Sequence, residues 1–243
     1  MAQGVIKLNK NFDIEVFFKQ LEVELRRSDI DLGQGLSEII ADFASFEQVL
    51  FKWQKVQNLV SRETLDEFWS RHIADSLQLL KFFNKETNLV VDFGSGGGFP
   101  AIVLAIALKK AKLNGAMVEF VLVEANSRKV AFLRAVKREL GLNILVKDSR
   151  IENFKLNDGV TPDIISARAL ASLDNLLGFS NQIWGKKTRA IFLKGKEYAE
   201  ELKKARVRWQ FNVVTYPNVI DVSGVVLEID GLLPILGKMP IKK

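Results

Sequence analysis

Four glycines lie close together in the stretch VVDFGSGGGFP, residues 90–100. They follow a run of strand-forming residues, and they are Gly94, Gly96, Gly97 and Gly98. Glycine weakens any regular element, so this spacing indicates a sharp turn or a close approach of the backbone to a ligand. A strand that ends in such a loop and leads into a helix presents backbone N–H groups and the positive helix terminus at the sheet edge. The stretch therefore predicts a site for a nucleotide-like cofactor.

The spacing of these glycines fits the dinucleotide-binding pattern G-x-G-x-x-G poorly. Counted from Gly94, the pattern fails because Phe99 occupies the last glycine position. Counted from Gly96, it gives Gly98 and Ala101, which is a weak match. A nicotinamide-dependent oxidoreductase therefore stays an alternative. Phe99 could also stack on a base.

Residues after the next two predicted strands could serve the same cofactor. Glu124 ends the run VLVE, where a carboxylate can accept hydrogen bonds from both ribose hydroxyls of a nicotinamide or S-adenosylmethionine cofactor, or can cap the next helix. In DSRIENF, residues 148–154, Ile151 could pack on an adenine ring and Glu152 could read its edge, although a plain turn also explains the stretch. Parallel strands end at one sheet edge, so we expect these residues near the glycine loop.

Three basic residues are candidates for contact with the substrate. Arg168 follows the predicted strand DIIS, and its planar guanidinium could anchor a carboxylate, a phosphate or guanine O6, or form a structural salt bridge. Lys194 ends the run FLK and could contact an RNA phosphate or be an ordinary surface lysine. His72 lies on an apolar helix stripe, where a functional role competes with that of a core residue, and Asp75 could orient it.

The elements before residue 85 carry a helical pattern. The segment 36–60 places apolar residues at three- and four-residue steps, which predicts an amphipathic helix, and 62–83 continues in the same way as a second helix. We expect a loose or short-helical start over the first thirty residues. Trp53 and Trp69 could stack on a base, but a place in the core explains them better.

After residue 85, short apolar runs alternate with helical stretches, which is typical of βαβ units with a mostly parallel sheet. The predicted strands lie at 89–93, 118–123, 144–147, 163–166, 190–194, 211–216 and 225–229. The predicted helices lie at 101–111, 127–140, 172–184 and 195–206. Ser127 and Gly141 are the expected caps of the second of these helices. A short turn at Asp221–Gly224 makes the last two strands an antiparallel pair.

The composition limits the chemistry. The chain has 243 residues, no cysteine and one histidine, which excludes disulfides, thiolate nucleophiles and a zinc site built from histidines, so we expect no metal. A formal net charge of +6 favours a polyanionic partner. The sequence shows neither an apolar run of about eighteen residues nor a signal-peptide pattern, so we expect a cytoplasmic protein without membrane contact. We also expect a monomer, a helical region at 1–84, an α/β domain at 85–243 and a solvated tail, LGKMPIKK.

Several segments together resemble a known family. They are NLVSRETLDEFWSRHIADSLQLL, VVDFGSGGGFPAIVLAI, VEANSRKVAFLRAVKRELGLN and PDIISARALASLDNLL, followed by FLKG. In order and spacing they resemble the small-subunit ribosomal RNA guanine N7-methyltransferases, also called glucose-inhibited division protein B. The similarity covers about residues 45–200. Its most specific parts are Gly-Phe-Pro after the glycine loop, Lys-x-x-Phe-Leu and Arg-Ala-x-Ala-Ser-Leu.

The resemblance implies a class I, Rossmann-like methyltransferase fold with S-adenosylmethionine as cofactor. It also implies methyl transfer to N7 of a guanine in the small-subunit (16S) ribosomal RNA, with the N-terminal helices forming part of the RNA-facing wall. By motif, the methionine end of the cofactor would be held by Gly94, Gly96, Gly98 and Phe99. Glu124 would hold the ribose, Ile151 and Glu152 the adenosine, and Arg168 would lie beside the methyl donor.

Methylation at guanine N7 suits a chain with few nucleophiles. N7 carries an exposed lone pair and needs no deprotonation, so the enzyme has only to align it with the methyl group and exclude water. Pyrimidine C5 methylation would normally need a cysteine, which this chain lacks. A protein or small-molecule acceptor stays an alternative, as does a binding module without catalysis.

Overall fold

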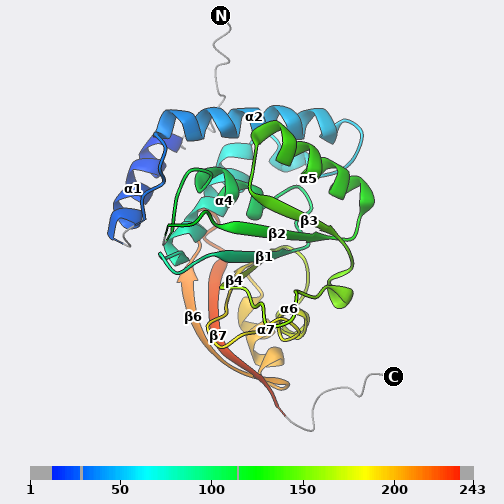
Figure 1. Ribbon diagram of the computed structural model, residues 1–243. Coiled ribbons are helices and arrows are strands. Elements are labelled where there is room, and N and C mark those ends of the chain that lie inside the picture. Colours follow the sequence, from blue (N-terminus) through cyan, green and yellow to red (C-terminus); the bar gives the residue numbers. More distant parts are fainter. Residues whose placement is uncertain (1–12, 28–29, 114, 236–243) are drawn as a thin grey trace, which may run out of the picture.

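A mixed β-sheet with helices on both faces forms the centre of the molecule (Figure 1). The computed structural model describes residues 13–27, 30–113 and 115–235, and the predicted tail lies outside them. Within that part of the chain the strand order is β3-β2-β1-β4-β5-β7-β6. The strands are β1 (Leu89–Phe93), β2 (Glu119–Glu124), β3 (Ile144–Asp148), β4 (Ile164–Arg168), β5 (Arg189–Lys194), β6 (Trp209–Pro217) and β7 (Val225–Pro234).

The pairing of the strands confirms the predicted sheet. β1 to β5 pair in parallel, and β7 lies antiparallel between β5 and β6. Strands β1, β2, β4 and β5 are buried on both faces, which explains their nearly continuous apolar runs. The chain order reverses between β1 and β4, and α/β sheets bind ligands beyond the carboxyl ends of the strands at such a point.

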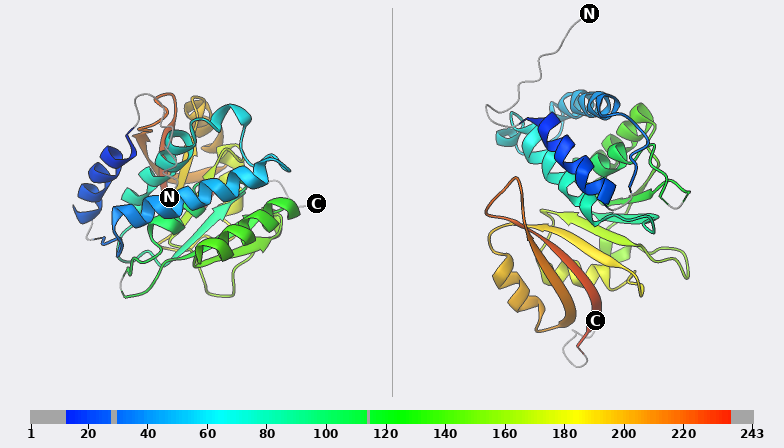
Figure 2. Two further views of the ribbon diagram at one scale, coloured as in Figure 1. Left: turned by 90° about the horizontal axis from the view of Figure 1, so that it is seen from above. Right: turned by 90° about the vertical axis from the view of Figure 1, so that its left-hand side faces the viewer.

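Two hydrophobic cores cover the two faces of the sheet. Val90, Ile164 and Ile191 face a core shared with helices α1, α2, α4 and α5, whereas Val91 and Ile165 face a core shared with α6 and α7. Figure 2 shows these two groups of helices on opposite sides of the sheet. The helices are α1 (Ile14–Arg27), α2 (Leu36–Gln54), α4 (Ala101–Ala107), α5 (Ser127–Leu140), α6 (Leu173–Ser180) and α7 (Tyr198–Ala205).

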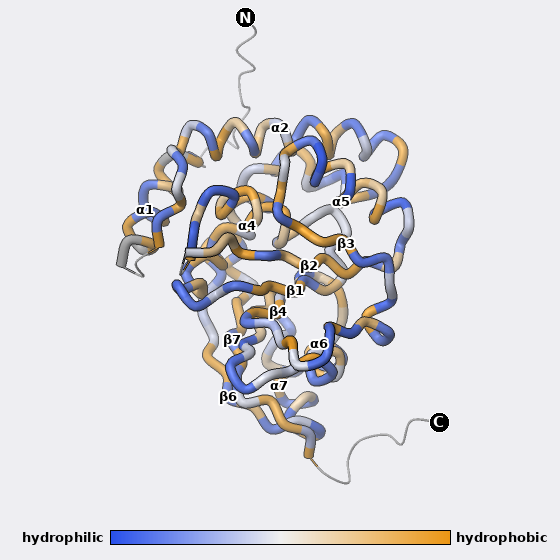
Figure 3. The backbone as a smooth tube through the Cα atoms, in the orientation of Figure 1, coloured by the Kyte–Doolittle hydropathy of each residue, from blue (hydrophilic) through white to orange (hydrophobic). Residues whose placement is uncertain are grey.

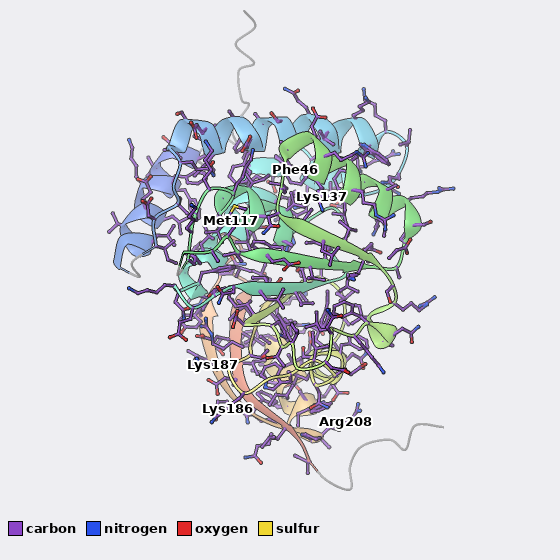
Figure 4. All side chains as sticks on the ribbon, in the orientation of Figure 1. Phe46, Met117, Lys137, Lys186, Lys187 and Arg208 are labelled. Atoms are coloured by element: carbon purple, nitrogen blue, oxygen red, sulfur yellow. The ribbon has the colours of Figure 1, made fainter. Side chains whose placement is uncertain are left out.

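Helix α2 confirms the first amphipathic pattern and packs its apolar face toward the sheet. Its alternation of hydrophobic and hydrophilic residues is visible in Figure 3. Phe46, labelled in Figure 4, has ring neighbours at centroid distances of 5.6 Å (Phe99) and 6.4 Å (Phe132). The helix is thereby joined to both the glycine loop and α5. Trp53 packs against this core and Trp69 is buried, which confirms their core interpretation.

The prediction of one continuous helix over 62–83 was wrong. This segment consists of η1 (Arg62–Thr64), the π-helical turn η2 (Phe68–Ala74), α3 (Asp75–Leu77) and η3 (Gln78–Phe82). Ser70 Oγ donates to Glu67 O and Ser76 Oγ donates to His72 O, and such side-chain bonds compete with the regular helical ladder. Single π-helical turns are frequent at functional sites.

Two smaller predictions about helices also needed correction. Within the first thirty residues, where a loose or short-helical start was expected, residues Ile14–Arg27 form α1, a regular helix of 14 residues. The cap of α5 is Asn126 rather than Ser127, because the Asn126 side chain accepts from the N–H groups of Arg128 and Lys129. Gly141 at the other end is left-handed, as predicted.

Other predicted helices are shorter than expected. The helix predicted at 101–111 ends at Ala107, where Gln34 Nε2 donates to the carbonyls of Ile106 and Ala107. The two remaining helices span 173–180 and 198–205, inside their predicted ranges of 172–184 and 195–206.

Candidate functional site

The glycine loop between β1 and α4 is held tightly against its neighbours. Gly94 has φ +65° and Gly98 has φ +92°, a region that favours glycine. A Cβ at Gly94 would lie 2.5 Å from Leu170 Cδ1, and one at Gly98 would lie 2.6 Å from Ile102 Cγ1. Glycine is therefore required at both positions by conformation and by space.

Glu124 at the end of β2 joins the glycine loop to the start of α5. One carboxylate oxygen accepts from Gly96 N at 2.9 Å and the other from Asn126 N at 2.8 Å. The side chain is buried, and each oxygen keeps acceptor capacity beyond its single bond. Glu124 thus lies beside the loop, as predicted, and the two roles considered for it are compatible.

Asp92 is a buried acid beneath the loop that the sequence analysis did not single out. Its neighbour in the sheet register, Ser166, donates from Oγ to Asp92 Oδ1 at 2.6 Å. Oδ2 is buried and has no hydrogen-bond partner among the described residues. Burial raises the pKa of Asp92 to about 7, although the Ser166 bond opposes the shift. The sequence signal for Asp92 was an acidic residue inside an apolar strand, two residues before the first glycine of the loop.

Arg168 is the last residue of β4 and connects the sheet to the 62–83 segment. Ile164, Ser166 and Arg168 alternate onto the face that this segment covers. The Arg168 guanidinium donates to Arg71 O at 3.0 Å and to Asp75 Oδ2 at 3.1 Å. Burial lowers its pKa and the Asp75 carboxylate opposes that shift. The salt bridge considered for Arg168 is therefore present.

His72 is neutral and has a partner at each ring nitrogen. Arg168 can only donate, so its contact at 2.5 Å makes His72 Nδ1 an acceptor. Nε2 then carries the proton and donates to Thr64 Oγ1 at 2.9 Å. Burial lowers the pKa of His72 to about 3, and the charges of Arg168 and Arg71 act in the same direction.

Phe99 completes the packing around this histidine. Its buried ring stacks on the His72 ring with centroids 4.6 Å apart, and the Arg168 guanidinium lies 5.1 Å from its centroid. A direct role for this ring in stacking on a base does not fit its buried position. Phe99 instead links the glycine loop to His72 and Arg168.

Asp75 binds Arg168 and the β6–β7 turn, so the expectation that it orients His72 was wrong. Its Oδ1 accepts from Gln78 Nε2 at 2.9 Å and from Asn218 Nδ2 at 2.7 Å. Burial raises the pKa of Asp75, while Arg168 and Asn218 oppose the shift. No sequence pattern pointed to Asn218, because its contact with Asp75 spans 143 positions.

Lys194 ends β5 as predicted but is engaged within the protein. Its ammonium pairs with Glu201 at 2.6 Å and donates to Ala171 O at 2.9 Å. Glu201 also accepts from Leu173 N at 2.6 Å. The pair therefore holds the segment 169–172, in which Ala169 has φ +49°.

A cleft of about 750 Å³ opens beside these residues. Its walls come from four segments, which are 64–75, 168–171, 193–195 and 218–224. Leu170 lines the cleft and also contacts Gly94, so the cleft and the glycine loop share a wall. Ile151 and Glu152 lie in η4 (Ile151–Asn153) after β3. In the strand order, β3 lies on one side of β1, which carries the glycine loop, and the strands that end at the cleft, β4 and β5, lie on the other side.

Comparisons with known proteins identify relatives over most of the chain. A family model described as rRNA small subunit methyltransferase G (GidB) matches residues 39–225. Ribosomal RNA small subunit methyltransferase G of Dinoroseobacter shibae is 39% identical over 188 residues, 77% of this chain and 93% of the relative. The protein of that name from Rhizobium leguminosarum bv. trifolii is 42% identical over 203 residues, 83% of this chain and 95% of the relative.

The fold agrees with this relationship. The structure of cofactor-bound Rv0187 from MTB matches with a TM-score of 0.53 and 12% identity, covering 78% of this chain and 89% of that one, which supports the fold alone. The sheet order, its antiparallel β7 and the glycine loop after β1 are those of the predicted class I methyltransferase fold. No helix in the described part of the chain is long and apolar enough to cross a bilayer. The chain belongs to the rRNA small subunit methyltransferase G family.

Proposed function

We propose that this protein transfers a methyl group from S-adenosylmethionine to N7 of a guanine in the small-subunit (16S) ribosomal RNA. The observation that carries the proposal is the family match over residues 39–225, in a chain whose glycine loop adjoins an open cleft. The relatives carry ribosomal RNA small subunit methyltransferase in their names. The resemblance of the motifs to the guanine N7-methyltransferases supports the choice of atom.

The residues around the glycine loop fit the cofactor. Gly94 and Gly98 keep the loop backbone packed against Leu170 and Ile102, where a side chain would clash, and the buried Asp92 Oδ2 lacks a partner among the described residues. Glu124 keeps acceptor capacity for ribose hydroxyls. In this proposal the methionine end is held by Gly94, Gly96, Gly98 and Phe99, the ribose by Glu124, and the adenosine by Ile151 and Glu152. When bound, S-adenosylmethionine supplies a methyl group on a positively charged sulfur.

The chain's own residues align the acceptor and do not need to remove a proton from it. Guanine N7 has an exposed lone pair, so alignment and exclusion of water are the main requirements. Both nitrogens of His72 are engaged, which leaves this residue a positioning role beneath Arg168. Arg168 lines the cleft and orients the acceptor there, and Lys194 acts by holding the adjoining segment 169–172.

The partner in this proposal is small-subunit ribosomal RNA, free or in an assembling subunit. The protein works as a cytoplasmic monomer, and its region 1–84 forms part of the RNA-facing wall. The cleft supports this arrangement because residues 64–75 contribute one of its walls and the strands of the α/β domain contribute the others. A target guanine that is stacked in the RNA would have to be flipped into the cleft.

Methyl transfer in vitro tests the proposal. The protein is incubated with S-adenosylmethionine labelled in its methyl group and with small-subunit RNA or subunits from cells that lack it. We expect label in N7-methylguanosine and in no other nucleoside. Labelled product that resists ribonuclease would instead indicate a protein or small-molecule acceptor. Binding of S-adenosylhomocysteine but not of NAD separates this function from that of an oxidoreductase.

A further inference from the structure

The glycine loop does not line the cleft, so the cleft leaves room for an acceptor beside the proposed cofactor site. Its volume of about 750 Å³ falls in the range of about 300–1,000 Å³ that is common for small-ligand sites. Most polar groups on its walls already have partners: Asp75 and Arg168 bind each other, and Lys194 is paired with Glu201. Glu67 forms an ion pair with Arg71 at 2.6 Å. These groups form the walls of the cleft, but they are already bonded within the protein and are not the first candidates to recognise a ligand.

Asp221 differs from them, because one of its carboxylate oxygens is free. Its Oδ1 accepts from Ser223 N at 3.0 Å and from Ser223 Oγ at 2.7 Å. Oδ2 has no hydrogen-bond partner within the described residues. The bonds from Ser223 lower the pKa of Asp221, so the carboxylate is ionised at neutral pH.

Asp221 lines the cleft together with Arg71 and Asp75 of the 64–75 segment, and its place on the wall is set by the β6–β7 turn. The turn that carries it is fixed by Asn218, whose Oδ1 accepts from the N–H groups of Ile220 and Asp221 at 2.7 and 2.9 Å. A free, ionised acceptor is therefore held at a defined place in the cleft.

The two purine bases differ in the hydrogen-bond donors that they present to such an acceptor. When N7 of a purine faces the methyl donor, its Watson–Crick edge points to the other side of the pocket. Guanine carries a 2-amino group there, while adenine has only hydrogen at that carbon. A flipped base is commonly read by hydrogen bonds to this edge. A carboxylate oxygen that accepts at the purine 2-position therefore selects guanine over adenine, whose single amino donor is on C6.

We infer that the cleft binds the target guanine and that Asp221 Oδ2 accepts a hydrogen bond from its 2-amino group, which makes Asp221 a specificity-determining residue. This inference rests on the proposed function and adds a site to it. It assigns the choice of base to the β6–β7 turn, outside the segments that form the cofactor site.

Inosine at the target position tests the contact, because it keeps N7, O6 and N1–H of guanosine but lacks the 2-amino group. Single-turnover methyl transfer is measured on undermethylated small-subunit RNA that carries guanosine or inosine at the mapped nucleotide. For the unaltered protein we expect guanosine to react about tenfold or more faster, since a hydrogen bond to a charged group is being removed.

The variant Asp221→Asn keeps Oδ1 for Ser223 but replaces Oδ2 with an amide donor. We expect its rate with guanosine to fall and its preference over inosine to approach one. Asp158→Asn, which changes an exposed carboxylate in a turn outside the cleft, should keep the preference. The inference is overturned if Asp221→Asn retains the preference, or if the unaltered protein has none. Failure of the unaltered protein to methylate any RNA would reject the proposed function itself.

Discussion

His72 is the chain's single histidine, and its burial beside the charges of Arg168 and Arg71 keeps it neutral over the physiological range. Because its pKa is lowered to about 3, we expect its ring resonances in an NMR titration to stay constant from pH 8 to pH 5. The same resonances in the urea-unfolded protein should titrate near pH 6.5, about the ordinary value. A midpoint between pH 6 and 7 in the folded protein would contradict the described bonding.

The same shift has a consequence for stability. Below its ordinary pKa of about 6.5, His72 binds a proton in the unfolded chain but not in the folded one. Its contribution to the free energy of unfolding is therefore complete above pH 6.5. It is lost progressively as the pH falls toward 3, at up to about 1.4 kcal/mol per pH unit.

Asp92 acts in the opposite direction, because burial raises its pKa from 3.8 to about 7. The folded state holds the extra proton between these values, so stability falls as the pH rises through this window. We predict that Asp92→Asn matches the unaltered protein near pH 4 and exceeds it above pH 7 by on the order of a few kcal/mol. Urea denaturation at pH 4, 6 and 8 measures the difference.

Asp158→Asn is the control for this series, since it makes the same chemical change at an exposed carboxylate in a turn. A constant gap between Asp92→Asn and the unaltered protein at all three pH values would show that Asp92 is not protonated in the fold. An acid that costs stability at neutral pH agrees with a functional role beneath the glycine loop.

The segment 169–172 after β4 connects the cleft and the glycine loop, because its residue Leu170 lines the cleft and packs against Gly94. Arg168 fixes its start through Asp75, and the Lys194–Glu201 pair fixes its end through Ala171 O and Leu173 N. Ala169 has φ +49°, which is unfavourable for a residue with a side chain. The pair therefore holds a segment that would otherwise relax.

Lys194→Met should destabilise the protein by on the order of 2 kcal/mol, because partly buried Glu201 would lose its ion-pair partner and Ala171 O would lose its donor. Hydrogen exchange at Leu173 N–H should become faster at the same time. The matched control is Lys203→Met on helix α7, which removes an exposed ion pair with Glu200 and should cost less than about 0.5 kcal/mol. Equal effects of the two variants would contradict the proposed role of Lys194.

The elements that could be predicted from sequence are those with local signals. Strand β1 and the glycine loop follow from an apolar run that meets a glycine cluster, and α5 follows from its stripe and Gly141. The 62–83 segment has a helical stripe, yet bonds from its own hydroxyl groups break it into short turns. Local side-chain bonds competed there with the helical ladder that the stripe predicts.

The same distinction explains the site. Glu124 and Arg168 stand at strand ends, where parallel topology places ligand-binding groups, so their neighbourhood could be predicted. Asn218 and Asp221 could not, because they reach the cleft through a turn between two antiparallel strands far along the chain. The pairing of Lys194 with Glu201 likewise depends on how α7 packs, so the spacing of residues in the sequence does not predict it.

At the scale of the whole molecule, positive side chains increase the affinity for RNA only on the surface that faces the RNA. Arg128 and Arg150 are exposed in the segments after β2 and β3, at the edge of the sheet that carries the glycine loop. Lys186 and Lys187, labelled in Figure 4, are exposed in the turn before β5, at the opposite edge.

We predict that the double variant Arg128→Ala/Arg150→Ala binds small-subunit RNA more weakly. The slope of log affinity against log salt should fall by up to about 2, because each lost phosphate contact releases one counterion fewer. Lys186→Ala/Lys187→Ala makes the same change in net charge and should leave both quantities unaltered. If the two pairs weaken binding equally, the RNA is not held at the carboxyl edge.

The most direct test of the central claim is to map N7-methylguanine in small-subunit ribosomal RNA from cells with and without this protein. N7-methylation makes the RNA strand cleavable at the modified nucleotide by aniline after borohydride reduction, so the position can be read from the fragment ends. We predict one cleavage site that is present with the protein, absent without it and restored by the unaltered chain. An identical cleavage pattern in both RNAs would contradict the proposed function.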